Sequence, residues 1–485
     1  MKILWLDDEI DLLKPHIMFL EDQGMKVIGI DHPLKALEIA KSEDFDVILI
    51  DYKMPQISGI EFAREIKKLH PNVPLVLITM VQDKEVMDEA YSIDVFDYLV
   101  KPVQPSQILA VLRKLEKDKI KNRAETRRIL NYYNAINSLG NDWKDWLEKG
   151  RLLFYWMVES PEDELLKEEL KTKNQDFATW VMRKYPELLN TPEVPFIFKV
   201  FKNHVFPLLK NGERVTLIVF DNFRFDQALE LSKAIPSGYN VEIHPIFSVL
   251  PTATQFARNS LFSGHTPYDT ERRNPGWTRD NLHEKELLEQ NLIENGFKNL
   301  PHVIKKINSL DAFKQEIFDA GLPLEVYVIN FFDMIFHLRE AESPLRGLIE
   351  NAEDYVKLCK FLLESSNFLE KLHTPNIIIT TDHGWVKGEK PVVIQGGMEA
   401  TEGLRFKFGD SLKALEGKPI ELMDLKKFGI PQIARMLFLA KGYDFFVYKS
   451  DPGKYKKRYM GGLFHGGLSI EEMIIPLIRL KRRLS

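Results

Sequence analysis

The sequence predicts an α/β protein of several domains, in which a helical region separates two α/β regions. Short apolar runs of strand length alternate with amphipathic helical runs over residues 1–118, and this alternation returns over 211–485. From Pro105 to about Lys210, strand-like runs disappear and leucine, lysine and glutamate are frequent. A chain of 485 residues suffices for about three domains. We place them at 1–118, 119–210 and 211–485.

The first region predicts a doubly wound parallel sheet. Its buried strands are expected in KILWLD, KVIGID, DVILID, PLVLIT and DYLVK, with amphipathic stretches such as LKALEIAKS and GIEFAREIKKL between them. Strands that alternate with helices form a parallel sheet with helices on both faces. Functional side chains are then expected beyond the carboxyl ends of the strands.

The middle region predicts a helical domain that begins with a long connecting helix near 105–137. Its stretch 113–128 is locally basic. A solvated helix face accounts for these charges, and contact with an anionic partner is the alternative.

The third region predicts a second, larger α/β domain. A helical run spans 342–373, and glycine-rich stretches at 384–409 and 450–467 are expected to be loops, which are often functional when long. The expected strands are VTLIVFD, YNVEIHPIFS, EVYVINF, NIIITTD, VVIQG and FFVYK.

Composition narrows the class of protein. The 66 basic and 71 acidic residues nearly balance, which argues against a polybasic nucleic-acid coat. Cys359 is the single cysteine, so no disulfide can form within the chain, as is typical of a reducing cytoplasm. The N-terminal apolar run is too short for a signal peptide, and no apolar run approaches the ~20 residues of a membrane span. We therefore expect a cytoplasmic protein.

Three carboxylates, Asp7, Asp8 and Asp51, follow strands of the first region. Parallel strands would bring them to one edge of the sheet, where a hard cation such as Mg²⁺ would offset their repulsion. Thr79 ends the fourth strand and Lys101 the fifth. A carboxylate nucleophile beside a cation, an ammonium and a hydroxyl makes a phosphoryl-transfer site. Helix caps and a surface charge are the alternative for each residue taken singly.

This pattern, with DYKMP around the central aspartate and a Lys-Pro pair, resembles the receiver domain of bacterial response regulators, whose fold is flavodoxin-like. The resemblance implies that Asp51 accepts phosphate from a sensor histidine kinase. It also implies that Asp8, Asp51 and the backbone carbonyl of Lys53 bind Mg²⁺ beside Asp7, and that Tyr98 occupies the aromatic switch position.

The third region carries a second set of candidate residues. Asp221 ends one strand, while Asp382 and His383 follow another. Asp333 and His337 stand at i and i+4, so one helix face would present both. His465 in GGLFHGG and Thr254 at the start of a helical run complete the set. These residue types suit zinc ligands and a hydroxyl nucleophile.

In motif order these residues resemble the alkaline-phosphatase superfamily, specifically its PglZ branch. The resemblance implies one zinc bound by Asp333, His337 and His465. It implies a second zinc bound by Asp221, Thr254, Asp382 and His383, with Thr254 as the nucleophile. Thr252 is the rival nucleophile, and an ordinary helix cap is the alternative role of Thr254. The spacing from Thr254 to Gly264 favours Thr254, as in the phosphodiesterases of the superfamily. The arginine clamp of alkaline phosphatases is not located in the sequence, which argues against a simple phosphomonoesterase.

The order of domains resembles the PorX-type response regulators of type IX protein secretion. That resemblance implies a histidine kinase, a sigma factor and a secretion-motor protein as partners. We further expect phosphorylation to promote a homodimer. Before His465, a basic stretch is expected to bind substrate phosphates and bases rather than be only a solvated loop: Lys454, Tyr455, Lys457 and Arg458.

The sequence therefore predicts a response regulator with a two-zinc phosphodiesterase that acts on nucleotides or oligonucleotides. The alternative is a transcriptional or scaffold regulator with a structural metal site. Structural zinc sites are closed and need no hydroxyl nucleophile, which favours the enzyme. The exact substrate, the sign of the phosphorylation effect and direct DNA binding stay open.

Overall fold

The computed structural model describes residues 1–55, 57–79, 95–333, 352–365, 367–396, 403–450 and 452–483. These residues form two compact units, Met1–Arg128 and Ile129–Ser485, and each is described by itself. In the described part of the chain, no helix has both the length and the apolar character needed to cross a membrane.

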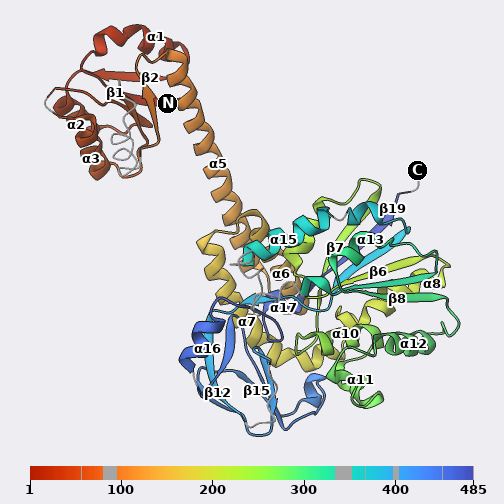
Figure 1. The fold of residues 1–485 in the computed structure, drawn as a ribbon. Coiled ribbons are helices and arrows are strands. Elements are labelled where there is room, and N and C mark those ends of the chain that lie inside the picture. Colours follow the sequence, from red (N-terminus) through yellow and green to blue (C-terminus); the bar gives the residue numbers. More distant parts are fainter. Residues whose placement is uncertain are drawn as a thin grey trace. The chain divides into compact units, whose positions relative to one another are not determined.

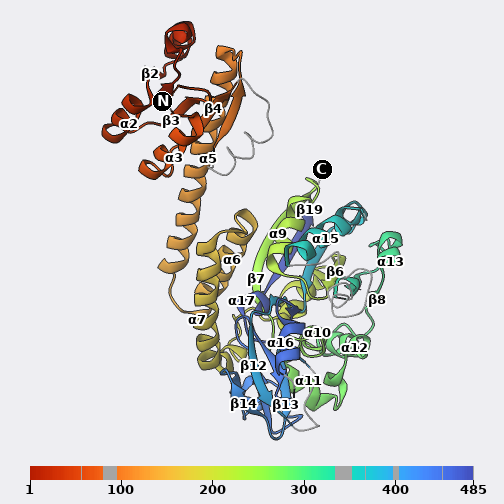
Figure 2. The ribbon, with the colours of Figure 1, turned by 60° about the vertical axis from the view of Figure 1, so that its left-hand side comes forward.

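The first unit contains the predicted five-stranded sheet, in the order β2-β1-β3-β4-β5 with every pairing parallel. Alternate residues of β1 point to opposite faces, so Leu4 and Leu6 join one apolar core and Ile3 and Trp5 the other. Helices α2 and α3 cover the first face, and α1 and α5 the second (Figure 2). The bounds are β1 Lys2–Leu6, η1 Ile10–Leu13, α1 Lys14–Asp22, β2 Lys26–Ile30, α2 Pro33–Ser42, β3 Val47–Asp51, α3 Gly59–Leu69, β4 Leu75–Thr79 and β5 Asp97–Val100.

Helix α5 spans Pro105–Ser138, as the sequence predicts (Figure 1). It is followed by α6, Trp143–Glu159, and α7, Glu164–Leu189. In the second unit α7 packs on the sheet that follows, because Trp180 contacts Phe247 of that sheet. Phe154 of α6 stacks on Phe225, which belongs to a helix. The helical segment up to Lys210 therefore shares one apolar core with the larger sheet. The chain reaches that sheet through η2 Ile197–Lys199, η3 Phe201–Val205 and α8 Phe206–Lys210.

The second unit is built on a six-stranded sheet with the order β7-β19-β10-β6-β9-β8. Strands β10, β6, β9 and β8 run parallel, whereas β19 lies antiparallel between β7 and β10. The sequence did not predict β8 or β19. The strands are β6 Val215–Phe220, β7 Tyr239–Phe247, β8 His302–Ile307, β9 Leu324–Ile329, β10 Asn376–Thr381 and β19 Ile474–Arg482.

Helices cover both faces of this sheet (Figure 1). Leu217 and Val219 of β6 face the core that α6, α10 and α12 complete, while Ile218 and Phe220 face the core that α15 completes. The predicted helical run at 342–373 is described from 352 onward. The remaining helices are α9 Phe225–Lys233, α10 Thr254–Ser263, α11 Pro267–Arg273, η4 Trp277–Arg279, α12 Glu284–Glu294, α13 Leu310–Gln315, α15 Ala352–Ser365, η6 Phe368–Lys371 and α17 Ile470–Met473.

The two glycine-rich stretches are more regular than predicted. Segment 384–409 contains strands, and the expected strands VVIQG and FFVYK pair with each other in a small separate sheet, β14-β12-β17. Segment 450–467 contains helix α16, Pro452–Tyr459, and strand β18, Leu463–Phe464. The other elements are β11 Val386–Lys387, β12 Lys390–Gln395, β13 Phe406–Gly409, β14 Lys413–Glu416, β15 Ile420–Leu422, η7 Lys426–Phe428, β16 Met436–Leu439 and β17 Asp444–Tyr448.

Candidate functional site

The acidic cluster of the first unit lies where the sequence predicts it. Ligand atoms of Asp7, Asp8 and Asp51 all lie within 4.8 Å of one another, so the three could hold a metal ion. The Lys101 ammonium reaches across the sheet edge to Asp7, at 2.9 Å, and Asp51, at 3.1 Å. Asp7 and Asp51 are buried, while Asp8 is exposed.

Burial and the nearby charge of Asp7 raise the pKa of Asp51, although Lys101 opposes this shift. Burial also disfavours the charge of Lys101, but its bonds to Asp7 and Asp51 outweigh burial and raise its pKa. The ammonium is therefore kept beside the carboxylate, where it can neutralise the oxygens of an incoming phosphoryl group.

The other predicted receiver residues surround this cluster. Thr79 is buried at the end of β4, and the exposed Lys53 lies in the loop after β3. Tyr98 of β5 is 39% exposed. The sequence reasoning missed Gly59, where a Cβ atom would lie 2.3 Å from the carbonyl oxygen of Asp51. Only glycine lets α3 begin this close to the aspartate.

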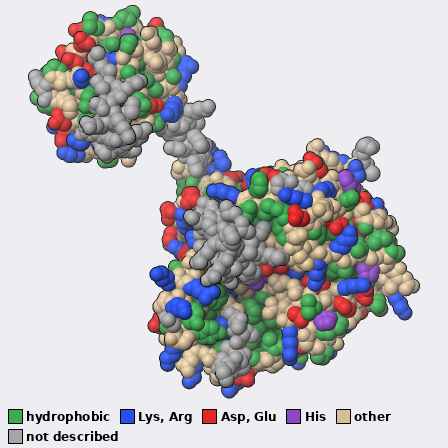
Figure 3. All heavy atoms as spheres, in the orientation of Figure 1, with side chains coloured by type: hydrophobic (Ala, Val, Ile, Leu, Met, Phe, Trp, Pro, Cys, Tyr) green, Lys and Arg blue, Asp and Glu red, His purple; other side chains and the backbone are tan. Residues whose placement is uncertain are grey.

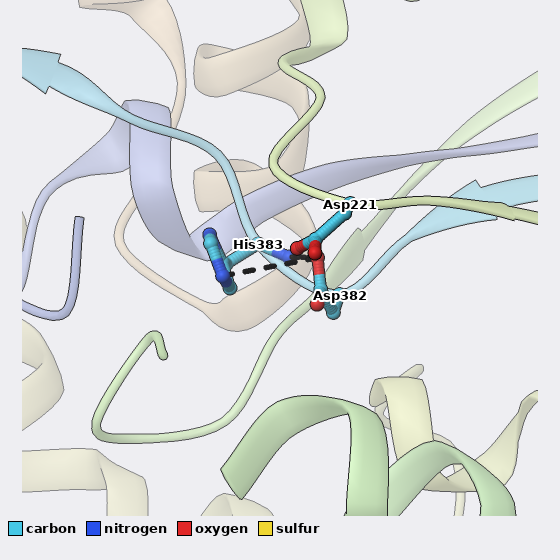
Figure 4. A group of neighbouring side chains, drawn as sticks. All are labelled: Asp221, Asp382 and His383. Atoms are coloured by element: carbon cyan, nitrogen blue, oxygen red, sulfur yellow. Dashed lines mark hydrogen bonds and ion pairs between the residues drawn. The ribbon is translucent and has the colours of Figure 1, made fainter. Parts of the chain in front are cut away.

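The carboxylates of the second unit meet because β6 and β10 are neighbouring parallel strands. Phe220 pairs with Thr381, so Asp221 and Asp382, the next residues, leave the same sheet edge together. Ligand atoms of Asp221, Asp382 and His383 lie within 4.8 Å of one another, and all three side chains are buried. Figure 4 shows these side chains turned toward one another.

Thr254 adds a hydroxyl to this cluster. Its Oγ1 lies 3.0 Å from Nε2 of His383 and 3.4 Å from Oδ1 of Asp221. Ala253 occupies the cap position of α10, so Thr254 is not the cap itself. The rival Thr252 is buried and donates a hydrogen bond of 2.7 Å to the carbonyl oxygen of Gly467. Its hydroxyl thus tethers a loop.

Asn222 joins Asp333 to the cluster. Its side-chain amide donates to Oδ1 of Asp333 at 2.9 Å, and its backbone N–H donates to Oδ1 of Asp382 at 3.1 Å. A left-handed backbone, with φ of 60°, permits both bonds, and asparagine tolerates that conformation. His337 lies outside the described residues.

His465 reaches the cluster through a short pairing of strands. Val386 of β11, close behind His383, pairs with Phe464 of β18. This register places the His465 ring on the His383 ring, with 4.3 Å between centroids. The loop is further held by Glu472, whose side chain accepts the backbone N–H of Gly467 and whose carbonyl oxygen accepts that of Gly384.

A buried arginine that the sequence reasoning missed completes the cluster. Arg258 lies one helical turn beyond Thr254 and is 0% exposed. Its Nη2 lies 2.5 Å from Oδ2 of Asp221 and 3.0 Å from Oδ2 of Asp382. Its spacing from Thr254, one helical turn, was the one feature of the sequence that could have placed it near the site.

Burial and the neighbouring charges shift the pKa values of Asp221 and Asp382 in opposite directions. Burial raises the pKa of Asp221, and the charges of Asp382 and Asp333 add to this, while Arg258 opposes it. Burial also acts on Asp382, but His383 and Arg258 outweigh it and lower the pKa of Asp382. Carboxylates with separated pKa values are typical of sites that do chemistry.

Comparison with known proteins finds a family for each of the two α/β regions. Residues 200–480, more than half of the chain, match the family described as the BREX system PglZ alkaline phosphatase-like domain. The chain belongs to the PglZ family. Residues 3–113 match the response regulator receiver domain. The chain is thus a response regulator with a receiver domain and a PglZ phosphatase-like output domain.

Individual relatives share a smaller part of the chain. The cyclic di-GMP phosphodiesterase response regulator RpfG of Xanthomonas campestris is 32% identical over 28% of this chain and 39% of its own length. The transcriptional regulatory protein ZraR of Escherichia coli is 32% identical over 23% of this chain and 25% of its own length. The chain therefore spans well under half of these relatives. Chemotaxis protein CheY4 of Vibrio cholerae, a solved structure, is 28% identical over 24% of this chain and 97% of its own, with a TM-score of 0.23.

The donor atoms of the PglZ domain fit zinc. Carboxylate oxygens and an imidazole nitrogen are zinc ligands, and Asp221, Asp382 and His383 offer them at mutual distances that one ion can span. The Thr254 hydroxyl faces the same point. The donors of the receiver are all oxygens, which suits Mg²⁺.

The basic stretch of the PglZ domain forms helix α16 instead of the expected loop. Tyr455 and Tyr459 stack with 2° between their planes and pack against the core that contains Phe464. Lys454, Lys457 and Arg458 are exposed, and Figure 3 shows basic side chains on the surface over α16. The charged groups, rather than the packed rings, are thus the exposed part of this helix.

Proposed function

We propose that the PglZ domain of this response regulator is a two-zinc phosphodiesterase for nucleotides or oligonucleotides, controlled by phosphorylation of Asp51. The observation that carries the proposal is the Thr254 hydroxyl, 3.0 Å from His383 and facing the carboxylate of Asp221. A hydroxyl at the start of a helix, among metal-ligand side chains, suits a nucleophile that attacks phosphorus.

The ligand division remains the one that the resemblance to the alkaline-phosphatase superfamily implies. Asp221, Thr254, Asp382 and His383 would bind one zinc, and Asp333, His337 and His465 the other. Zinc would lower the pKa of a bound hydroxyl and polarise a phosphoryl oxygen. Asn222 supports this division, because its amide and backbone N–H orient one carboxylate of each group.

The reaction would proceed through the threonine. The Thr254 hydroxyl would release its proton to solvent, because the two groups that face it, Nε2 of His383 and Oδ1 of Asp221, are metal ligands in this division. The Thr254 oxygen forms a bond to phosphorus, the bond to the leaving alcohol breaks, and that alcohol takes up a proton. Water then attacks the phosphothreonine, which releases a phosphate monoester and restores the hydroxyl.

The receiver would set the activity of this site in the cytoplasm. The carboxylate of Asp51 takes a phosphoryl group from a kinase histidine, with Asp7, Asp8, Asp51 and the Lys53 carbonyl holding Mg²⁺ and Lys101 beside the acceptor. Thr79 and Tyr98 would respond to the new phosphoryl group. A role in type IX secretion, with a sigma factor and a motor protein as partners, rests on the resemblance in domain order.

Turnover of bis(p-nitrophenyl) phosphate by the zinc-loaded full chain tests the proposal. Valine has the shape of threonine without its hydroxyl, so Thr254→Val should abolish turnover and keep the fold. Thr252→Val is the matched control, and it should melt earlier yet retain most turnover, because the Thr252 hydroxyl bonds to Gly467. Full activity in Thr254→Val would refute the proposed nucleophile.

A further inference from the structure

Arg258 is unusual because a whole guanidinium group is buried among acidic groups. Three carboxylates surround it, since Nη1 lies 3.3 Å from Glu284 in addition to the contacts of Nη2 with Asp221 and Asp382. Nη1 also donates to Oδ1 of Asn330 at 2.8 Å. A buried charge is expensive unless it is paired, so this arrangement needs all of its members.

Arg258 contacts the Oδ2 atom of each of the two aspartates and leaves each Oδ1 atom to other groups. On Asp382, Nε and Nη2 bind Oδ2 at 3.1 and 3.0 Å, whereas backbone N–H groups of Asn222 and His383 bind Oδ1. On Asp221, Nη2 binds Oδ2, which leaves Oδ1 toward Thr254.

We propose that Arg258 is the positioning residue of the Thr254 site, a built-in counter-cation that holds Asp221 and Asp382 by their Oδ2 atoms and turns Oδ1 of Asp221 toward the threonine hydroxyl. The proposal deepens the proposed function and rests on it for the role of Thr254. Arg258 would also balance the buried carboxylates before a metal ion arrives. A guanidinium is suited to this because its planar fork binds two carboxylates at once and it stays charged.

Thermal melting of the full chain, with a chelator or with zinc, tests this role. Arg258→Met removes the charge and keeps a long apolar side chain, so the chelated variant should melt several degrees below the unchanged protein. Zinc should then raise the melting temperature of Arg258→Met more than that of the unchanged protein, because the ion supplies the missing positive charge between the carboxylates.

Arg214→Met is the matched control. Arg214 also pairs with two carboxylates, Asp319 and Glu325, but at the opposite end of β6 from Asp221. Its loss should lower the melting temperature without a larger response to zinc. Equal zinc responses in Arg258→Met and Arg214→Met would overturn the proposal.

A second pair of variants separates charge balance from simple packing. Adding Asp221→Asn to Arg258→Met removes one of the unbalanced carboxylates, so the double variant should melt above Arg258→Met in chelator. Should Arg258→Met alone fail to fold, recovery of folded protein in the double variant gives the same answer. No recovery would mean that Arg258 serves only to fill space, and the proposal would fail.

Arg258→Lys tests positioning. A single ammonium keeps the charge but cannot make the forked contact, so kcat for the diester should fall about tenfold with little change in KM. Absence of diester turnover in the unchanged protein would refute the proposed function, whereas the melting experiments would still decide the role of Arg258 as counter-cation.

Discussion

The imidazole ring of His383 lies face to face with that of His465, with centroids 4.3 Å apart and 16° between the planes. Residues 82 positions apart in the sequence thus meet at one point, because strands β11 and β18 pair directly beside them. Two neighbouring imidazoles would suit the two adjacent zinc sites proposed above.

Zinc content should respond to each of these histidines separately. Because the proposed division assigns them to different ions, His383→Ala and His465→Ala should each lower the content from near two toward one zinc per chain. Elemental analysis of the purified chain measures this. His244→Ala is the control, since His244 is exposed on β7 and contacts Glu242. Unchanged zinc in both site variants would show that the ions bind elsewhere.

A small phosphodonor should label Asp51. With Mg²⁺ and acetyl phosphate, mass mapping should find the phosphoryl group on Asp51 and should find none in Asp51→Ala. Lys101→Ala should slow labelling, because the ammonium 3.1 Å from the carboxylate would no longer neutralise the phosphoryl oxygens. Label on Asp8 in the unchanged protein would contradict the assignment.

Neutralising Asp51 should stabilise the magnesium-free receiver at neutral pH. Burial and the charge of Asp7 raise the pKa of Asp51, so the folded receiver binds this proton more tightly than the unfolded chain does. The free energy of unfolding therefore falls as the pH rises from the pKa of Asp51 in the unfolded chain through its higher pKa in the folded receiver. Asp51→Asn should raise the melting temperature at neutral pH, and the difference should shrink toward about pH 4. Calorimetry with a chelator measures it, with the exposed Asp44→Asn as control.

The cations of α16 should serve long substrates more than short ones. Lys457→Ala with Arg458→Ala should raise KM for an oligonucleotide but leave KM for bis(p-nitrophenyl) phosphate unchanged. Loss of two phosphate contacts should also reduce the slope of log KM against log salt by about 1.4. Lys167→Ala is the control, because its ammonium pairs with Glu164 on α7. An unchanged salt slope would exclude α16 from substrate binding.

Phosphorylation should promote dimers. Helix α5 begins directly after the loop that follows Lys101 and continues over 34 residues. One continuous helix thus leads from the receiver into the first residues of the second unit. Light scattering with and without beryllofluoride should show an increase in molar mass. A constant mass with Asp51 occupied would rule out this form of control, since a switch shifts an equilibrium only by its differential affinity for the two states.

Much of the fold was predictable because its strands are apolar and regularly spaced. All five strands of the receiver were found in this way. Strand β19 was missed because IIPLIRLKR contains a proline and charges, and β8 because two lysines interrupt HVIKKI. Segment 450–467 was expected to be a loop because of its glycines, yet the packing of Tyr455 and Tyr459 on the core supports a helix. Such packing depends on distant residues.

The site was predictable where a residue ends a strand. Asp221, Asp382 and Asp51 are of this kind, because neighbouring parallel strands bring their ends together. Arg258 and Asn222 were missed because an arginine inside a helix is usually solvated and an asparagine after a strand usually makes a turn. Only the fold shows that one is enclosed by carboxylates and that the other joins Asp333 to Asp382.

The insertion of β19 between β7 and β10 has a consequence for synthesis on the ribosome. The receiver draws all its strands from the first 100 residues, so it can fold while the rest of the chain is still being made. The larger sheet stays divided, with β7 separated from β10, until residues 474–482 emerge. The order of translation therefore delivers the sensory part of the molecule before the hydrolase-like part can assemble, and a ribosome that stalls before β19 releases a receiver without a finished output domain.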